Sequence, residues 1–295
     1  MKSYKYSVVD VFTNERFKGN PLAVVFTDSD LELSAYENMA REFGYSETSF
    51  IYYSKADKAL KIRSFTPTGF EIHGAGHNLL GAVCAAVLSG MEIFHEQDGK
   101  PFVIMKDEKI HLSINQSDNK LPFVGMLQKP ATIENFADTK IIAEALTLNP
   151  DDIGIDDLIP TVVKTEVTHL MVPVKNLEIL NKSISIKSLL IKAANEYKFE
   201  GVYCFAILNN DPQYFAQTRF FNPGIGIDED PATGSAAGPL AGFLFHYKYI
   251  NPSASYQLLQ GVKMNQPSII KFEVRQEGIW ISGSSIMVME GTIYE

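Results

Sequence analysis

Residues 219–238 read RFFNPGIGIDEDPATGSAAG. The stretch begins as an apolar, strand-like segment, continues through Gly, Asp and Pro residues typical of a turn, and ends in small residues that favour a helix. The first backbone N–H groups of a helix have no partner within the helix, and this end attracts anions such as carboxylates. Residues 233–235 therefore predict an anion-binding helix start, with Glu229 and Asp230 on its rim.

The same pattern occurs once earlier in the chain. Residues 63–67 read RSFTP, and residues 219–223 read RFFNP. His77 follows the first motif within GAGHN, Ser235 follows the second within ATGSA, and both lead into apolar helices predicted over 79–88 and 236–245. A chance match is the poorer explanation, because strand, turn and helix all agree, so the repeat predicts two homologous domains.

Composition limits the classes of function. The chain has 295 residues, a formal net charge of −9 and a pI near 5.2, which argue against nucleic acid or an anionic membrane as a partner. No segment has the apolar length of a membrane span, and the N-terminus lacks the apolar core of a signal peptide. Two cysteines make a disulfide framework improbable. We therefore expect a cytoplasmic protein.

Strands outnumber helices in the sequence pattern, and most are sequential neighbours, which favours antiparallel sheets with one dominant helix per domain. Ser34 and Glu37 predict a capping box for a helix that runs to Phe43 and stops at Gly44. Separate strands are predicted over 278–281 and 287–294. The polar segment 116–121 is the predicted domain boundary.

Glu47 is a candidate general acid or base. It stands at the predicted start of a strand, among Tyr45, Phe50 and Tyr52. Aromatic surroundings disfavour a charged carboxylate, which suits proton transfer. From the residues alone, a solvent-exposed loop glutamate is the simpler interpretation, because charged residues are mostly exposed.

The two histidines His73 and His77 have the spacing of a metal-binding pair. Gly74 and Gly76 between them predict a turn, and no Cys or acidic residue stands at zinc-site spacing, so we expect no metal here. His77 stands at a predicted helix start, where the helix dipole favours the neutral form of its imidazole. A neutral ring could accept or donate a proton. His73 could equally be a rim residue.

Asp230 and Ser235 frame the second turn. Asp before Pro is a turn former and Ser is a common helix-start residue, so both also have a purely structural interpretation. Ser235 is not in a Gly-x-Ser-x-Gly elbow, and no phosphate-binding glycine loop is present. Cys84 and Cys204 fall within a predicted apolar helix and strand, so they are expected in the core, and a two-thiol racemase is disfavoured.

Taken together, these motifs resemble the PhzF-like family of phenazine-biosynthesis isomerase relatives, which share the diaminopimelate-epimerase fold. The resemblance rests on VDVF at 9–12 with FKGNP at 17–21, SETSF at 46–50, the first repeat through AGH at 75–77, and EDPATGSA at 229–236. It implies an α+β fold of two pseudo-symmetric domains, each an antiparallel barrel-like sheet around a central helix. The implied limits are 1–118 plus about 284–295, and 119–283.

The resemblance also implies a site and an activity. Glu47 would be the general acid/base, with His77, Asp230 and Ser235 as further catalytic residues. Substrate-binding positions would be Asn20, Gly76, Asn78, Thr233 and Gly234. The family is thought to need no metal or organic cofactor and is commonly homodimeric.

The chain departs from the family pattern at Asn78-Leu79 and at residues 72–74, so the phenazine precursor need not be the substrate. We expect a cofactor-free isomerase that moves a proton by acid/base catalysis on a small carboxylate-bearing metabolite. Two alternatives stay open: a non-thiol amino-acid epimerase or racemase, and a catalytically silent protein of the same fold that binds a small ligand.

Overall fold

The computed structural model describes residues 2–91, 101–115 and 121–295. Contacts between residues divide the chain into two compact units, Met1–Leu127 with Ser282–Glu295, and Gln128–Ile281. The predicted linker at 116–121 lies almost wholly outside the described residues, and the predicted domain limits stay a prediction. Within the described ranges, every helix is too short or too polar to cross a lipid bilayer.

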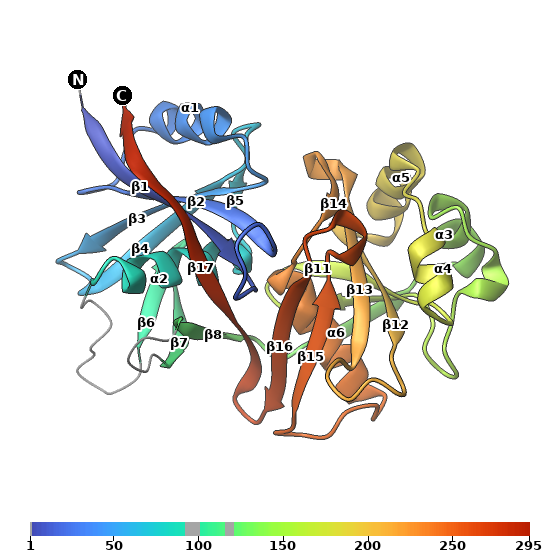
Figure 1. Ribbon diagram of the computed structural model, residues 1–295. Helices are drawn as coiled ribbons and strands as arrows, with labels where there is room; N and C mark the ends of the chain where they lie inside the picture. The colour runs from blue at the N-terminus through green and yellow to red at the C-terminus, as the bar shows by residue number, and fades with distance from the viewer. Residues whose placement is uncertain (1, 92–100, 116–120) are drawn as a thin grey trace. The chain divides into compact units, whose positions relative to one another are not determined.

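The first unit alternates strands with two helices (Figure 1). Its elements are β1 (Ser3–Val11), β2 (Asn20–Phe26), α1 (Leu33–Phe43), β3 (Thr48–Ser54), β4 (Ala59–Phe65), β5 (Glu71–Ile72), α2 (His77–Leu88), β6 (Phe102–Met105), β7 (Glu108–Asn115) and β8 (Phe123–Gln128).

The second unit repeats this order with additional helices. Its elements are β9 (Thr132–Phe136), α3 (Thr139–Ala145), β10 (Thr161–Lys164), β11 (Thr168–Pro173), α4 (Leu177–Lys182), α5 (Lys187–Tyr197), β12 (Gly201–Ile207), β13 (Ala216–Asn222), β14 (Ile227–Asp230), α6 (Gly234–His246), β15 (Ser255–Gln260), β16 (Ser268–Arg275) and β17 (Gly278–Tyr294). The final strand continues into the first unit, where it pairs with β1.

Strand pairing shows that the two units share one topology. In the first unit, β1–β2 and β3–β4–β5 are antiparallel, whereas β2–β3 and β4–β6 are parallel. In the second unit, β10–β11 and β12–β13–β14 are antiparallel, whereas β11–β12 and β13–β15 are parallel. The fold is thus α+β, with two pseudo-symmetric barrel-like sheets, as the family resemblance implies.

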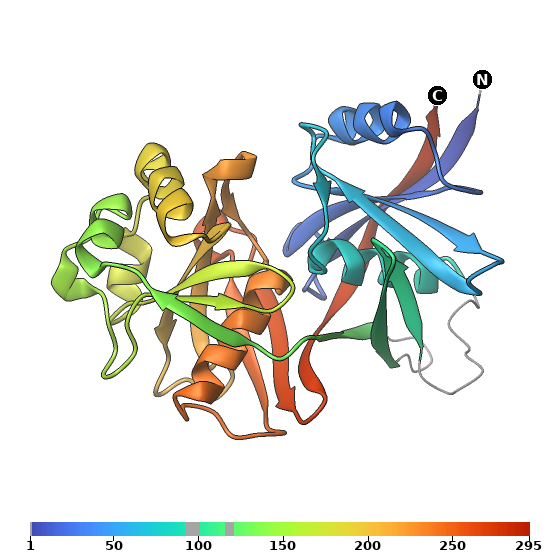
Figure 2. The same cartoon turned by 180° about the vertical axis from the view of Figure 1, so that it is seen from behind.

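One buried helix packs inside each barrel-like sheet. Helix α2 packs against β1 to β4, and α6 packs against β9, β10, β11 and β16 (Figure 2). Strands cover most of their circumference, so both helices are apolar on nearly every face. Gly81 lets α2 approach the sheet closely: a Cβ there would lie 2.6 Å from methyl groups of Val11 and Leu22.

Two local predictions were wrong. Ser34 does not cap α1, because the helix begins at Leu33 and its N-cap is Glu32, which makes no side-chain capping bond. The stop at Gly44 is confirmed by its left-handed φ of 69°. The two strands predicted near the C-terminus are one continuous strand, β17, whose residues Ser285 to Tyr294 follow the register of β1.

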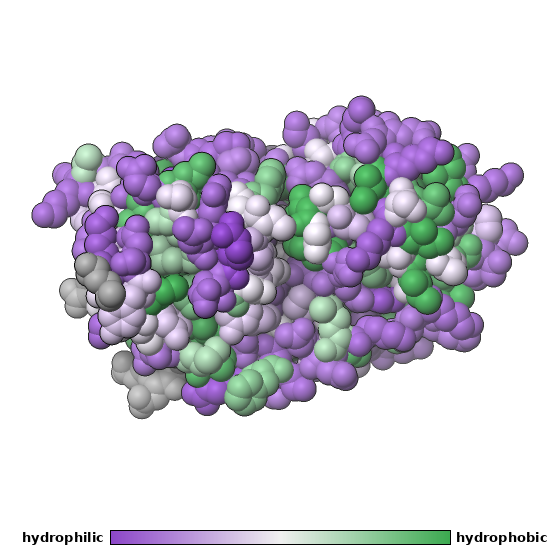
Figure 3. Space-filling view, turned by 90° about the horizontal axis from the view of Figure 1, so that it is seen from above, coloured by the Kyte–Doolittle hydropathy of each residue, from purple (hydrophilic) through white to green (hydrophobic). Residues whose placement is uncertain are grey.

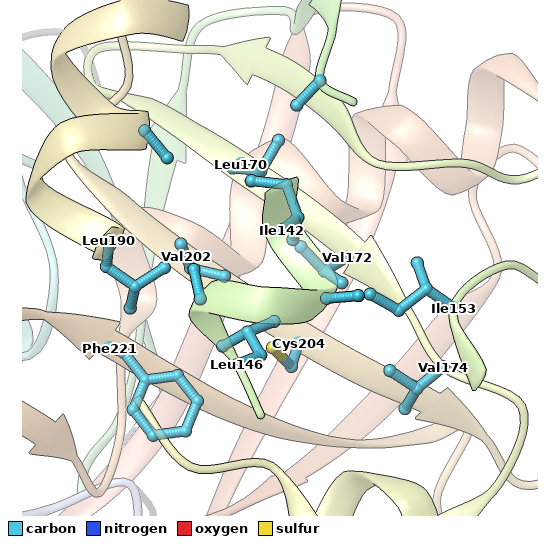
Figure 4. Close-up of a cluster of buried hydrophobic side chains, with 14 of the residues drawn as sticks. Ile142, Leu146, Ile153, Leu170, Val172, Val174, Leu190, Val202, Cys204 and Phe221 are labelled. Atoms are coloured by element: carbon cyan, nitrogen blue, oxygen red, sulfur yellow. The ribbon is translucent and has the colours of Figure 1, made fainter. Parts of the chain in front are cut away.

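The helices α3 and α5 form a separate apolar layer with one face of β11 and β12. Figure 4 shows this cluster, in which Ile142, Leu146, Leu190 and Cys204 are all buried.

The face seen in Figure 3 is mainly hydrophilic, with scattered apolar patches. Among exposed apolar side chains, Phe17 is 76% exposed and Ile184 is 64% exposed.

Candidate active site

Each repeat contains an arginine–glutamate ion pair. Arg63 on β4 donates from Nε and Nη2 to the two carboxylate oxygens of Glu71, both at 2.8 Å. Arg219 on β13 donates in the same way to Glu229, at 2.8 and 2.7 Å. Such two-point pairs fix geometry as well as charge. The acidic residue Glu229, predicted on the rim of the turn, is therefore held by Arg219.

These pairs define equivalent positions in the two units. Six positions after Glu71 stands His77, the first residue of α2, and six after Glu229 stands Ser235, the second residue of α6. The repeat read from the sequence thus describes a real structural correspondence. It places one polar side chain at the start of each central helix.

Glu47 directly precedes β3 and is only 8% exposed. Two residues further along the strand, the Ser49 hydroxyl donates to the Asn78 carbonyl at 3.1 Å and hydrogen-bonds to the Ser64 hydroxyl at 2.8 Å. These bonds hold the start of β3 against the first turn of α2. The structure therefore buries the carboxyl group, whereas the residues alone favoured an exposed loop glutamate.

Asn78 shapes the turn that leads into α2. Its Oδ1 accepts the N–H groups of Gly76 and Leu79, both at 2.8 Å, and its Nδ2 donates to the Gly74 carbonyl at 3.1 Å. Both Asn78 and Asn20 are 1% exposed, the latter as the first residue of β2. In this structure the Asn78 amide serves its own turn, and the Gly76 N–H is occupied by it.

The two histidines have different environments. His77 is 4% exposed, and burial lowers its pKa to about 3, so the ring is neutral. Its Nε2 is buried without a hydrogen-bond partner among the described residues. His73 is exposed and lies beside the ring of Phe70, with centroids 6.5 Å apart. Within the described ranges, no three His, Cys, Asp or Glu side chains could hold a metal ion together.

The second turn brings Asp230, Thr233, Gly234 and Ser235 together. Asp230 ends β14 and is 4% exposed, and its Oδ2 accepts the hydroxyl proton of Thr233. Thr233 is the N-cap of α6 and its carbonyl accepts the N–H groups of Ala236 and Ala237. The Ser235 side chain is only partly buried. A hydroxyl, a carboxylate and a helix start thus converge.

Both helices offer backbone donors. At α2 the N–H groups of His77 and Asn78, and at α6 those of Gly234 and Ser235, make no hydrogen bond to another described residue. This is the normal state of an uncapped helix start. Each terminus can therefore donate two hydrogen bonds to an anionic oxygen.

Sequence reasoning missed the residues that support the second turn. Gln260 on β15 is fully buried, and its amide contacts both Asp230 and Thr233. Gln128 donates from Nε2 to the Gly234 carbonyl at 3.1 Å. A Cβ at Gly238 would lie 1.7 Å from Gln128 Oε1, so the glycine makes room for that contact. No local signal marks either glutamine, because each is distant from the turn in sequence.

The carboxylates are placed asymmetrically. Arg63 pairs with Phe50 and Arg219 with Cys204, so the strand registers match Glu47 with Gly201. A Cβ at Gly201 would lie 2.3 Å from the ring of Phe220. In the same way, Asp230 corresponds to Ile72, because each directly follows the paired glutamate of its repeat.

The two cysteines are fully buried, as predicted. Burial raises the pKa of each thiol to about 12. Neither stands at a helix start, where the equivalent positions carry His77 and Ser235. A pair of thiol bases at the two helix termini is therefore absent from this chain.

Comparison with known proteins gives consistent matches over the full chain. A family model described as phenazine biosynthesis-like protein (PhzC-PhzF) matches residues 9–291. A trans-2,3-dihydro-3-hydroxyanthranilate isomerase from Pseudomonas aeruginosa is 30% identical over 298 residues, covering 99% of each chain.

Solved structures agree. A phenazine biosynthesis protein of the PhzF family from Bacillus anthracis superposes with a TM-score of 0.86 at 24% identity, covering 100% of both chains. A predicted epimerase from Pseudomonas aeruginosa gives a TM-score of 0.82 at 27% identity, covering 99% of both. The likeness to the Bacillus anthracis structure shows the fold. The family model adds a match in sequence over residues 9–291.

Proposed function

Starting from the fact that this chain belongs to the phenazine biosynthesis-like PhzC-PhzF family and is an isomerase, we propose that it moves a proton on a small carboxylate-bearing metabolite by general acid/base catalysis, without a cofactor. The observation that carries the proposal is the buried carboxyl group of Glu47, held by β3 against the start of α2. A carboxyl group in such a position can serve as base and then as acid.

Glu47 would take a proton from one carbon of the substrate and return it to another. The C–H bond that breaks leaves its electron pair in the substrate, the double bond shifts, and a new C–H bond forms with the proton that Glu47 carries. No atom is gained or lost, and Glu47 ends in its starting protonation state. One carboxyl group is therefore sufficient for an isomerisation along one face of the substrate.

The helix starts would stabilise the charge that develops during this shift. The free N–H donors of α2 and α6 suit a carboxylate or an enolate oxygen, and one preorganised donor at such a position contributes about 100- to 1,000-fold in rate. Neutral His77 would line the substrate position and assist proton transfer. Asp230 and Ser235 would bind the substrate or assist the proton shift.

The substrate class follows from the chemistry of these groups and from the relatives. Anion-binding helix starts favour a ligand with a carboxylate. The Pseudomonas aeruginosa relative is named for trans-2,3-dihydro-3-hydroxyanthranilate, a small cyclic diene with a carboxylate. We propose a metabolite of that class, with Gly76, Asn78, Thr233, Gly234 and Asn20 as binding positions.

A non-thiol epimerase is the principal alternative, and one solved relative is a predicted epimerase. A two-base epimerase needs one base on each face of the substrate. In this chain the counterpart of Glu47 is Gly201, and the ring of Phe220 occupies the space that a side chain there would need. The counterpart of Asp230 is apolar Ile72. This asymmetry argues against two carboxylate bases at equivalent positions of the two units.

The test is proton–deuterium exchange in D₂O, followed by NMR, on trans-2,3-dihydro-3-hydroxyanthranilate and other small acidic metabolites. Wild type is compared with Glu47→Gln, which preserves the size of the side chain. We expect turnover and a labelled carbon for wild type, and loss of both in the variant. A variant that retains wild-type turnover would remove Glu47 from its role.

The third possibility, a silent binding protein, gives a different result. Tight binding of one compound by both wild type and Glu47→Gln, with no exchange in either, would replace the enzyme proposal by this one.

We also propose a cytoplasmic location, which the two buried free thiols support, and a homodimeric assembly, which the family resemblance supports. Light scattering of the purified protein tests the assembly, and a mass of one chain would contradict the dimer.

A further inference from the structure

A polar cluster is buried beneath the Asp230–Thr233 turn. Tyr203, Thr218 and Gln260 lie on the strands β12, β13 and β15 and are between 0% and 1% exposed. Thr218 Oγ1 donates to the Tyr203 hydroxyl at 3.0 Å, and that hydroxyl donates to Gln260 Oε1 at 2.8 Å. The cluster links three strands to the start of α6.

Two backbone groups fix the orientation of the Gln260 amide. Its Oε1 accepts the Thr233 N–H at 3.2 Å, and its Nε2 donates to the Asp230 carbonyl at 2.8 Å. A backbone N–H can only donate and a backbone carbonyl can only accept. The flipped amide would therefore oppose both partners, so only one orientation satisfies the turn.

This orientation determines where the Thr233 proton points. The second Nε2 hydrogen of Gln260 donates to Thr233 Oγ1 at 3.0 Å, so that oxygen serves as an acceptor. The Thr233 hydroxyl proton is then directed to Asp230 Oδ2. Gln260 thus controls the backbone N–H of Thr233, its hydroxyl and, through the hydroxyl, the Asp230 carboxylate.

Gly261, the residue after Gln260, lies close to the backbone of this turn. Gly261 has a left-handed φ of 74°, and a Cβ there would lie 2.7 Å from the Pro231 carbonyl oxygen and 2.2 Å from that of Gln266. Only glycine fits this position without displacing backbone. The end of β15 therefore supports the turn through backbone contact as well as through the amide.

The fold itself does not require polar side chains at the positions of Thr218 and Gln260. In the first unit Ile62 pairs with Met105 at the register where Thr218 pairs with Gln260 in the second. Ile62 and Met105 are 1% and 2% exposed, so the same buried positions accept apolar side chains. A buried polar cluster is demanding, because every group needs a partner. The polar pair Thr218 and Gln260 has an apolar counterpart in the first unit, which indicates a role in the site of the second unit.

We propose that Gln260 is a positioning residue, which aims the Thr233 hydroxyl and N–H and thereby holds the Asp230 carboxylate for the reaction. Tyr203 and Thr218 hold Gln260 in turn. This inference rests on the proposed function, because it takes Asp230 and Thr233 as parts of the isomerase site.

The test compares four variants with wild type. Gln260→Met introduces the residue found at the equivalent position of the first unit. Gln260→Glu keeps an acceptor but removes both N–H donors. Thr233→Val removes the hydroxyl, and Thr233→Ser retains it. The control is Ile142→Val in the α3–α5 layer, which lowers stability modestly without touching the cluster.

Two readouts are measured for each variant. The first is kcat and KM with trans-2,3-dihydro-3-hydroxyanthranilate. We expect Gln260→Met and Gln260→Glu to lower kcat by about 10- to 100-fold, because a small displacement of a reacting group has effects of that size. KM should change by less than about threefold. Thr233→Val should lower kcat as well, and Thr233→Ser should retain more activity than Thr233→Val because it keeps the hydroxyl group. Ile142→Val should stay close to wild type.

The second readout is amide hydrogen exchange, which needs no substrate. Loss of the Gln260 acceptor should accelerate exchange in the segment 230–237 by about tenfold, with no change in the α3–α5 layer. Unchanged exchange there in Gln260→Met would overturn the positioning role, as would unchanged kcat. A wild type that converts no compound would contradict the proposed function alone, and the exchange result would still decide whether Gln260 holds the turn.

Discussion

His77 and Ser235 are equivalent residues of two repeats that carry different chemistry. Each stands six positions after the glutamate of an arginine–glutamate pair, in the first turn of its central helix. His77 is buried and neutral, whereas Ser235 is partly exposed. The repeat therefore preserved the framework of two helix starts while the side chains on them diverged.

The two arginine–glutamate pairs should contribute unequally to stability. Arg219 and Glu229 side chains are 7% and 18% exposed, whereas those of Arg63 and Glu71 are 27% and 28% exposed. Breaking a buried pair costs about 3–5 kcal/mol, and an exposed one about 0–1 kcal/mol.

Arg219→Met should therefore lower the free energy of unfolding more than Arg63→Met, by about 2 kcal/mol or more. Arg219 also donates to the Leu180 and Ser183 carbonyls, so Arg219→Met loses these hydrogen bonds as well and its stability falls further. Urea unfolding of both variants measures the difference. Equal losses would show that burial does not distinguish the pairs.

Gly201 should be intolerant of a side chain because of Phe220. A Cβ there meets the ring at 2.3 Å, and overpacking of this kind costs about 1–3 kcal/mol. Gly201→Ala should lower the melting temperature, and adding Phe220→Leu should recover part of the loss relative to Phe220→Leu alone. A double variant whose losses simply add would contradict the packing explanation.

Stability should fall in acid because of buried histidines. Burial lowers the pKa of His169 to about 3, against about 6.5 in an unfolded chain. Between these values the unfolded state binds the additional proton, so the free energy of unfolding rises with pH, by up to about 1.4 kcal/mol per pH unit. Above about pH 6.5 the effect disappears.

His169→Asn tests this, because the Asn oxygen can replace Nδ1 as acceptor of the Gly201 N–H. Its unfolding free energy should depend on pH less steeply than that of wild type between about pH 4 and 6.5. His77 remains in the variant and contributes a slope of the same sign. An unchanged slope would mean that His169 is protonated in the folded protein.

The cysteines should be inert in the native protein. Burial raises the pKa of both thiols to about 12, and the thiolate is the reactive form. A thiol reagent such as 5,5′-dithiobis(2-nitrobenzoate) should release no colour from folded protein at neutral pH and two equivalents after denaturation. Rapid labelling with loss of activity would instead favour a thiol mechanism.

Much of the fold could be predicted because its signals are local. The repeat of Arg-x-Phe-x-Pro with a following small-residue helix identified α2 and α6, and Gly44 identified the end of α1. The Ser34 cap failed because the helix begins at Leu33, two residues earlier than the motif requires. The continuity of β17 was hidden by residues 282–285, which read SGSS and include a glycine, a residue depleted in strands; of these four, Ser285 pairs with Val11 of β1.

The site was only partly visible for the same reason. Glu47, His77 and Asp230 stand in recognisable motifs, but burial of Glu47 depends on Ser49, Ser64 and Asn78 meeting in space. Gln260 lies 30 positions beyond Asp230, and only the parallel pairing of β13 with β15 brings it beneath the turn. Such non-local contacts leave no pattern in one sequence.

The most direct test of the central claim follows the proton itself. Substrate carrying deuterium on the carbon that loses its proton is converted in H₂O under single-turnover conditions, and the product is analysed by NMR. If Glu47 carries the proton within the site, part of the deuterium should appear on the carbon that gains a proton, and Glu47→Gln should give no product. Product formed at the wild-type rate by Glu47→Gln would contradict the account.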